Sequence, residues 1–420
     1  MDIEKVLDWL SPLPPLSRSP STEPTAVFYL NPSSPSSIPR SISSSEALPS
    51  NVALATLVQQ KHLAPLAASG LILDCRSPVP PSELSAHLHA AGQAVMRLPR
   101  RGKVVVLSSP DDVTSSLLEG FVLALSKEAA RNHTSVNLLI DEVGSEGLPD
   151  AVSFFLSAPS SFITGQLLSC GAAPAVPEPL SATALVTGAG GGIGRAIAEE
   201  LARTGDFKEI VLTDHPSAEA NLDATRALLG ESAVALPLDI THASAPASLA
   251  AACSSPVAAL VHAAGITADA SMKRMPLNKF QRCMDINYSA IASVDDHFLE
   301  QGAFADGASV VLLSSVSGVA GNAGQVNYST AKSGLLGYAK DRSKKVEGVA
   351  WNAIAPGFID TDMVRTIPAL NRVAIVRAVT SMKARGLPAD VAAATRMLAR
   401  GGGGFRGQCL RVCGGMLIGR

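Results

Sequence analysis

The segment ATALVTGAGGGIGRAIAEELA, at residues 182–202, constrains the fold more than any other part of this chain. An apolar stretch ends at Thr187, glycines fill five of the next seven positions, and an amphipathic stretch follows. Glycine lets a backbone approach a pyrophosphate closely, and the N-terminus of the next helix offers it free N–H groups. Because this loop joins a predicted strand to a predicted helix, the segment predicts a βαβ unit with a dinucleotide site.

Later strand ends offer further cofactor contacts. The strand EIVLTDHP carries Asp214, twenty residues after Gly194. An acid there can accept hydrogen bonds from the adenosine ribose and repel a 2′-phosphate, so NAD(H) is favoured over NADP(H). The alternative is that Asp214 only caps the next helix. In LPLDIT, Asp239 can reach the adenine edge, and the small residues of ALVHAAGIT would let the chain lie against the cofactor.

The stretch QVNYSTAKSG places Tyr328 four residues before Lys332. Residues with this spacing share a helix face, so the pair could be an ordinary exposed contact. The chemical alternative is a tuned acid, because a ketone that is reduced by hydride needs a proton at its developing alkoxide. A free tyrosine has a pKa of about 10. A neighbouring ammonium favours the phenolate, so we expect Lys332 to lower the pKa of Tyr328.

The chain of 420 residues is long enough for two domains. Residues 1–50 are rich in Ser and Pro, which predicts disorder or a loosely ordered segment, although the embedded AVFYL could form a short strand. Residues 51–172 alternate strand-like and helix-like stretches. A Pro-rich linker is expected at 173–181 and a second domain at 182–420. The expected fold class is α/β, with two doubly wound parallel-sheet (Rossmann-like) domains, the first degenerate.

The first domain contains an internal echo of the second. KVVVLSSPDDV resembles SVVLLSSVSGV, LLEGFVLALSK resembles AKSGLLGYAKD, and FITGQLLSCGA resembles FRGQCLRVCGG, all in the same order. Chance similarity between αβ units is the alternative to duplication. When Gly120 is aligned with Gly334, the tyrosine and lysine positions fall on Thr114 and Leu118. We therefore expect residues 51–172 to bind no nicotinamide cofactor and to serve in packing, against the second domain or in an oligomer.

Composition excludes several classes of function. With 34 basic and 36 acidic side chains and 4% aromatic residues, the chain lacks the basic or aromatic surface of a nucleic-acid-binding protein. The six cysteines form no CxxC pair and are interpreted as small buried hydrophobic residues in a reducing compartment. No metal site is therefore expected, although Cys409 and Cys413 share a strand face. No apolar run reaches the roughly 18 residues of a membrane span. The acidic start MDIEKVLDWL fits neither a signal nor a transit peptide, so a cytoplasmic location is expected.

These motifs resemble those of the short-chain dehydrogenase/reductase superfamily. The loop that starts at Thr187 matches its nucleotide-binding motif, and Tyr328-x-x-x-Lys332 matches its catalytic signature. Ser315 precedes Tyr328 by thirteen residues, as the catalytic serine of the family does, and Asn287 matches the fourth catalytic member. NAIAPGFIDTDM resembles the loop that closes over the nicotinamide.

The resemblance implies a role for each residue. Tyr328 would be the acid, Ser315 would bind the substrate carbonyl, Lys332 would also bind the nicotinamide ribose, and Asn287 would hold a water that links Lys332 to solvent. The implied cofactor contacts are Gly188, Gly192, Ile193, Gly194, Asp214, Asp239, Ile240, Ala263, Ala264, Gly265, Tyr328, Lys332, Ile359 and Thr361. The chain departs from the family at His262 and Ala263, which replace two asparagines. We interpret His262 as a structural substitute rather than a catalytic base.

Within the superfamily, the residues resemble 3-oxoacyl-(acyl-carrier-protein) reductases of the high-molecular-weight type, which carry a degenerate first half. The resemblance implies reduction of 3-oxoacyl thioesters, on acyl-carrier protein or CoA, in fatty acid metabolism, by a homodimer or homotetramer. Asp214 makes NADH the expected cofactor of this reaction. One alternative is a 3-hydroxyacyl-CoA dehydrogenase or a reductase of another ketone, such as a polyketide or a steroid. The other, from a different class, is an NAD(H)-sensing pseudoenzyme or scaffold.

Overall fold

The structure is a computed structural model that describes residues 27–30, 70–76, 81–110, 112–142, 147–171, 181–361, 364, 369–401 and 404–416. Apart from the strand β1 (Val27–Leu30), the predictions for residues 1–50 fall outside these residues, as does nearly all of the linker 173–181. The chain forms two compact units. Unit 1 comprises Met1–Ala172, Arg365–Gly386 and Cys413–Leu417, and unit 2 comprises Ala173–Val364, Leu387–Val412 and Ile418–Arg420.

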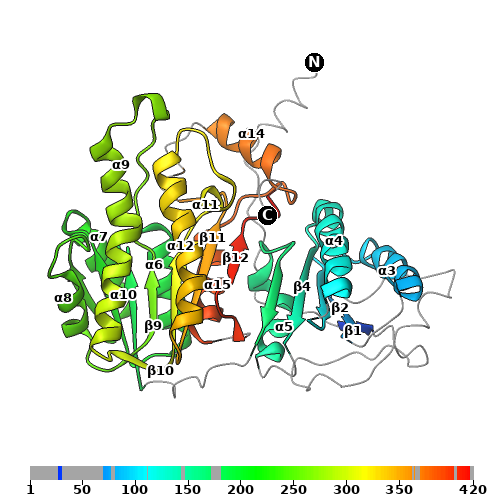
Figure 1. Ribbon diagram of the computed structural model, residues 1–420, viewed down its shortest axis with the longest axis horizontal. Coiled ribbons are helices and arrows are strands. Elements are labelled where there is room, and N and C mark those ends of the chain that lie inside the picture. The colour runs from blue at the N-terminus through cyan, green and yellow to red at the C-terminus, as the bar shows by residue number, and fades with distance from the viewer. Residues whose placement is uncertain are drawn as a thin grey trace. The chain divides into compact units, whose positions relative to one another are not determined.

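Unit 2 is built on a seven-stranded parallel sheet in the order β12-β11-β10-β9-β6-β7-β8 (Figure 1). Its strands are β6 (Thr183–Thr187), β7 (Glu209–Asp214), β8 (Ala233–Pro237), β9 (Val257–His262), β10 (Phe304–Leu313), β11 (Val349–Pro356) and β12 (Cys409–Val412). The strand order reverses at β6, which lies between β7 and β9. In such sheets the crevice beyond the carboxyl ends at the reversal is where ligands bind.

Helices cover both faces of this sheet. They are α6 (Gly192–Thr204), α7 (Glu219–Leu229), α8 (Ala245–Ala252), α9 (Leu277–Met284), α10 (Ala290–Glu300), α11 (Val316–Ala320), α12 (Val326–Lys345) and α15 (Pro388–Ala399). Helix α6 packs against α15, and α10 and α12 are turned to the viewer in Figure 1. A π-helical turn, η5 (Asp285–Ser289), joins α9 to α10. Three basic residues in the last turn of α12 suit the negative end of the helix dipole.

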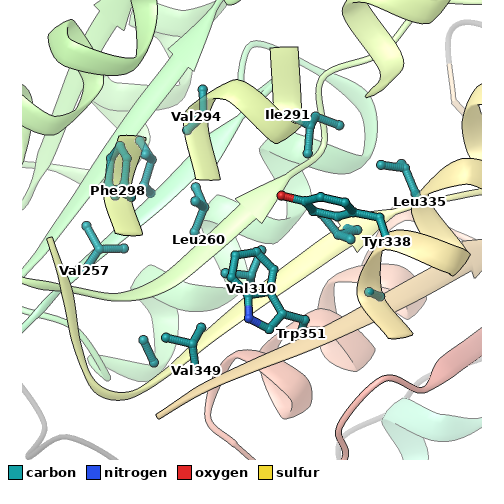
Figure 2. Close-up of a cluster of buried hydrophobic side chains, with 14 of the residues drawn as sticks. Val257, Leu260, Ile291, Val294, Phe298, Val310, Leu335, Tyr338, Val349 and Trp351 are labelled. Carbon is teal, nitrogen blue, oxygen red and sulfur yellow. The ribbon is translucent and has the colours of Figure 1, made fainter. Parts of the chain in front are cut away.

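The core beneath α8, α10 and α12 fixes the catalytic helix on the sheet. Trp351 of β11 is fully buried, and its indole meets the ring of Tyr338 of α12 edge to face, with centroids 6.0 Å apart (Figure 2). Such an aromatic pair contributes about 1 kcal/mol beyond the area it buries. Phe298 and Leu335 lie in the same cluster. Packing along α12 therefore sets the position of the polar residues at the start of that helix.

Unit 1 carries a five-stranded parallel sheet in which the described strands follow chain order. Besides β1, they are β2 (Gly70–Cys75), β3 (Lys103–Ser108), β4 (Ser135–Asp141) and β5 (Leu167–Cys170). Its helices are α3 (Pro81–Val95), α4 (Asp112–Ala129), α5 (Leu148–Leu156) and α14 (Ala369–Val379), with 3-10 turns η1 (Ala130–Asn132) and η2 (Ala158–Ser160). The predicted α/β class with two parallel, Rossmann-like sheets is confirmed.

The two sheets share a hydrogen-bond pattern that supports duplication over chance. In unit 1, Asn137 Nδ2 donates to Ile163 O (3.2 Å) and its Oδ1 accepts from Gln166 N (3.0 Å). In unit 2, Asn352 Nδ2 donates to Phe405 O (2.7 Å) and its Oδ1 accepts from Gln408 N (3.1 Å).

The glycine before each glutamine, Gly165 or Gly407, has φ +67°. The order β1 to β5 also corresponds to β6-β9-β10-β11-β12 of the larger sheet, with β7 and β8 left out.

Candidate active site

The glycine-rich loop between β6 and α6 requires glycine for two reasons. Gly188 has φ +70°, and a Cβ there would lie 2.6 Å from Ala264 N. A Cβ on Gly194 would lie 2.0 Å from Gly188 O, so no side chain fits at this position in the first turn of α6. The loop therefore folds tightly against the end of β9 and leaves the N–H groups at the start of α6 free for an anion. Gly192 is exposed and Ile193 half-buried at this helix start.

The carboxylate of Asp214, at the end of β7, lies against this loop. Gly190 N donates to its Oδ2 (2.8 Å) and His215 N to its Oδ1 (2.7 Å). The next helical turn is capped by the His215 side chain, which accepts from Ser217 N (3.2 Å). This geometry therefore speaks against the alternative that Asp214 caps the following helix, and it leaves an acid beside the glycine loop.

Asp239 follows β8, the strand next to β7. Its Oδ1 accepts from Thr241 N (2.9 Å) and from Thr241 Oγ1 (2.7 Å). These hydrogen bonds, joined by the charges of His215 and Arg282, lower the pKa of the Asp239 carboxyl. The adjacent Ile240 is half-buried. The rim beside Asp214 thus carries a second carboxylate.

The chain after β9 passes close to both the loop and the catalytic lysine. Ala264 N donates to Thr187 Oγ1 (3.1 Å). A Cβ on Gly265 would lie 2.5 Å from Asn287 Oδ1 and 3.1 Å from Lys332 Nζ. Only a residue without a side chain fits there, and the backbone of 263–265 forms a wall between the glycine loop and α12.

Three catalytic candidates come together at the carboxyl end of β10 and the start of α12. Lys332 is buried, its Nζ donates to Leu313 O (2.7 Å), and the same nitrogen lies 5.8 Å from the centroid of the Tyr328 ring. Ser315 caps α11, where its Oγ accepts from Ser317 N (3.1 Å). Burial raises the pKa of the Tyr328 phenol, and a hydrogen bond with the Ser315 hydroxyl partly offsets this rise.

Asn287 lies within the π-helical turn η5 and is buried. Its Nδ2 donates to Ile266 O (2.9 Å) and Cys283 O (2.8 Å), and its Oδ1 accepts from Ile266 N (3.2 Å). The side chain therefore ties the loop after β9 to the helix pair α9–α10, close to Lys332.

Burial is the largest influence on the pKa values of both Tyr328 and Lys332. It raises the pKa of Tyr328, against the lowering effect of Ser315, with Cys283 and Asp269 adding to the rise. Burial also lowers the pKa of Lys332 to about 8. The predicted lowering of the Tyr328 pKa is wrong for this geometry, because desolvation of the phenol raises the pKa by more than the hydrogen bond with Ser315 lowers it.

The loop after β11 returns to the glycine loop. Gly357 N donates to Val412 O (2.9 Å), Ile359 is buried, and Thr361 N donates to Ile359 O (2.9 Å). The Cγ2 atom of Thr361 would lie 3.8 Å from a Cβ on Gly192. Thr361 therefore lies over the start of α6.

Sequence reasoning missed two groups that hold the lysine. The Leu313 carbonyl accepts from Lys332 Nζ, and the Ser314 hydroxyl donates to Lys332 O (2.7 Å). Gly318 leaves room for the same turn, because a Cβ there would lie 2.7 Å from Lys332 C. The Ser314–Ser315 doublet was the available signal for this second contact.

His262 is buried at the end of β9, and its Nε2 lies 2.9 Å from Asp295 Oδ1. This placement agrees with the interpretation of His262 as a structural residue. Within the described residues, no three His, Cys, Asp or Glu side chains are grouped as a metal ion would need. Among the described helices, none is both long and apolar enough to cross a membrane.

The arrangement fits a nicotinamide dinucleotide. A Cβ on Gly188 or Gly194 would fill the space in the glycine loop where a dinucleotide would bind. The free N–H groups of α6 face this space, and Asp214 lies against the same loop.

Comparison with known proteins agrees with this arrangement. Residues 182–371 match the family model described as short chain dehydrogenase. The chain is 34% identical over 241 residues to the 3-oxoacyl-[acyl-carrier-protein] reductase FabG of Vibrio cholerae, an alignment that covers 56% of this chain and 97% of the relative. The FabG of Escherichia coli is likewise 34% identical, over 244 residues, with the same coverage.

A solved structure of a variant of actinorhodin polyketide ketoreductase with NADPH is also similar. It has a TM-score of 0.51 and 25% sequence identity, and the match covers 56% of this chain and 97% of that chain.

Proposed function

The chain belongs to the short-chain dehydrogenase family, and from this membership we propose that it reduces the ketone of 3-oxoacyl thioesters to the 3-hydroxyacyl product. The acyl group would be carried on acyl-carrier protein, as the name of the Vibrio cholerae relative says of that protein, or on CoA. The observation that carries the proposal is that Ser315, Tyr328 and Lys332 lie together beside the glycine loop. Assembly as a homodimer or homotetramer remains a prediction.

The residues of the site divide the work of ketone reduction. A bound nicotinamide cofactor supplies the hydride. Tyr328 is the proton donor: its raised pKa keeps the phenol protonated at neutral pH, and an alkoxide is basic enough to take that proton. Ser315 donates a hydrogen bond to the substrate oxygen as negative charge develops there. Lys332, held by Leu313 O, places a positive charge beside the phenolate that remains.

We further propose that the enzyme prefers NADH. The support is Asp214, whose carboxylate accepts from Gly190 N and would face a 2′-phosphate with like charge. The similar polyketide ketoreductase structure holds NADPH, so the comparison favours the other cofactor for that protein. Ratios of kcat/KM for NADH and NADPH with one thioester substrate decide between the two, and a preference for NADPH refutes this assignment of Asp214.

A second candidate function is reduction of a polyketide ketone, which the structural similarity to a polyketide ketoreductase favours. A panel of 3-oxoacyl-CoA thioesters of several chain lengths and a cyclic ketone, each with both nicotinamide cofactors, separates the two functions. Faster turnover of the thioesters supports the first. Turnover of the cyclic ketone alone supports the second.

A cofactor-sensing pseudoenzyme predicts a third result. It would bind NADH, seen as a change in nicotinamide fluorescence, and would turn over nothing in the panel. A fall in turnover of at least about 10²-fold in Tyr328→Phe, with cofactor binding kept, is expected of an enzyme and would exclude a pseudoenzyme.

A further inference from the structure

Unit 1 contains two stretches from the far end of the chain, Arg365–Gly386 and Cys413–Leu417. The first stretch follows the loop of Thr361, which lies over the start of α6, and leads into α15, which packs on α6. Its described part, residues 369–386, is called the anchored segment below. The contacts within unit 1 show what holds it there.

The first contact joins the segment before β5 to the chain after β12. Gly414 N donates to Phe162 O (2.9 Å). Gly414 has φ +61°, and a Cβ there would lie 2.4 Å from Cε2 of the fully buried Phe162 ring. The next residue repeats the arrangement, because a Cβ on Gly415 would lie 2.9 Å from Thr164 Cγ2. The Phe162 ring therefore packs directly against the backbone of Gly414, which has no side chain.

The second contact joins that glycine pair to the anchored segment. Ser381 N donates to Gly415 O (3.0 Å), Met382 N donates to Gly414 O (3.1 Å), and Ser381 Oγ donates to Gly415 O (2.7 Å). Thr380 forms an antiparallel bridge with Met416. Thr380 and Met382 are buried, so these hydrogen bonds are shielded from water.

The two contacts form one stack: residues 162–164 of the first domain, then 414–416, then 380–382. We propose that Phe162 is a positioning residue, through which the first domain holds the anchored segment and so restrains the loop of Thr361 that precedes it. Residues 51–172 would then affect cofactor binding in unit 2, although they contribute no catalytic group. The effect on cofactor affinity rests on the proposed function, whereas the anchoring itself does not.

Amide hydrogen exchange of the whole chain tests the anchoring without any turnover. In Phe162→Ala, exchange of the amides of Ser381, Met382 and Gly414 should speed up about tenfold, while that of β10 stays unchanged. Phe162→Leu, which keeps an apolar side chain, should restore most of the protection. Leu118→Ala is the matched control, because Leu118 is equally buried in the same domain but belongs to the core around α4.

Unchanged exchange in Phe162→Ala overturns the proposal, and so does an equal effect of Leu118→Ala, which would mean only a loosened domain. Gly414→Ala adds a second test. Its methyl group would meet the Phe162 ring, so Gly414→Ala combined with Phe162→Ala should lose less protection than the two single losses predict together. Additive losses would contradict a direct contact.

Steady-state kinetics then test the consequence. Phe162→Ala should raise KM for the nicotinamide cofactor about tenfold with kcat within about twofold of wild type, because the loop of Thr361 lies over the start of α6 and binding rather than chemistry is disturbed. An equal fall in kcat and kcat/KM would refute the positioning role. If the wild-type enzyme reduces no thioester, the proposed function fails, while the exchange data still decide the anchoring.

Discussion

The His262 imidazole and the Asp295 carboxylate form a buried pair in which Nε2 lies 2.9 Å from Oδ1 and the side chains are 1% and 0% exposed. The pair joins the end of β9 to α10, the helix that continues from the turn of Asn287. His262 also lies opposite Thr187 and Leu312 in the sheet register, one residue before the backbone wall that faces the glycine loop. Its position is therefore structural but close to the site.

Removal of one partner should destabilise the protein strongly. His262→Ala leaves the Asp295 carboxylate buried without its partner, which typically costs about 3–5 kcal/mol. Urea unfolding should show this as a lower midpoint. The double variant His262→Ala/Asp295→Asn should lose less than the sum of the single losses. A loss below about 1 kcal/mol in His262→Ala, the level of an exposed pair, would contradict a buried interaction.

The glycine loop offers a prediction with a matched control. Gly194→Ala should abolish dinucleotide binding, because the new Cβ would lie 2.0 Å from Gly188 O and the loop must move. A Cβ on Gly191 would meet no atom within 4 Å, and Gly191 has φ −174°, so Gly191→Ala should leave the fold of the loop intact. Nicotinamide fluorescence titration and thermal unfolding of both variants provide the comparison. Retained cofactor affinity in Gly194→Ala would mean that the dinucleotide does not bind at the glycine loop.

The acid role of the tyrosine gives the most direct test of catalysis. Tyr328→Phe removes the proton donor while it keeps the ring, so kcat should fall by about 10²–10⁴-fold. Cofactor affinity should stay unchanged, since the phenol is needed for the chemical step. The single-turnover rate of NADH oxidation with acetoacetyl-CoA measures this step. A variant with full activity would assign the proton to another group.

Local patterns in the sequence predicted much of this site, because the chemistry depends on residues close along the chain. The glycines of 188–194 and the pair Tyr328 and Lys332 each lie within one strand–helix turn or one helix. The sequence also indicated that the second sheet repeats the first, and the matching amide hydrogen bonds of Asn137 and Asn352 support this repeat.

What the sequence did not predict depends on packing between distant residues. The hydrogen bond from Lys332 to Leu313 O joins residues 19 apart, and the one from Gly414 to Phe162 joins the two halves of the chain. The direction of the Tyr328 pKa shift was wrong for the same reason. A motif shows which side chains are neighbours along the chain, whereas the burial that raises this pKa exists only after folding.

The low pKa of Lys332 predicts opposite effects of pH on activity and stability. Burial lowers this pKa to about 8 from an ordinary value near 10.5. Above pH 8 the ammonium is lost, so kcat/KM should fall. Between pH 8 and 10.5 the unfolded chain binds more protons than the folded one, so the Lys332 contribution to stability should rise with pH.

Lys332→Met tests both effects. The variant should be inactive, and its stability relative to wild type should be greatest below pH 8, where a buried charge is absent only from the variant. The difference, at most about 3 kcal/mol for a shift of this size, should shrink as pH rises to 10. Urea midpoints across this range measure it. A difference that is independent of pH would mean that Lys332 keeps an ordinary pKa.

Asp214 provides the last prediction, which concerns cofactor choice. In Asp214→Ala the carboxylate that would repel a 2′-phosphate is gone, together with the acceptor for Gly190 N and for a ribose hydroxyl. The variant should lose about 1–3 kcal/mol of NADH binding, as is usual when a buried donor is left unpaired, and should gain in use of NADPH.

The control is Asp239→Asn, which keeps the shape of a carboxylate on the neighbouring strand end and removes its charge. Because Asp239 Oδ1 is already engaged by Thr241 N and Thr241 Oγ1, this change should shift the NADH/NADPH ratio of kcat/KM far less. Equal shifts in the two variants would mean that the net negative charge of the rim, rather than one carboxylate, selects the cofactor.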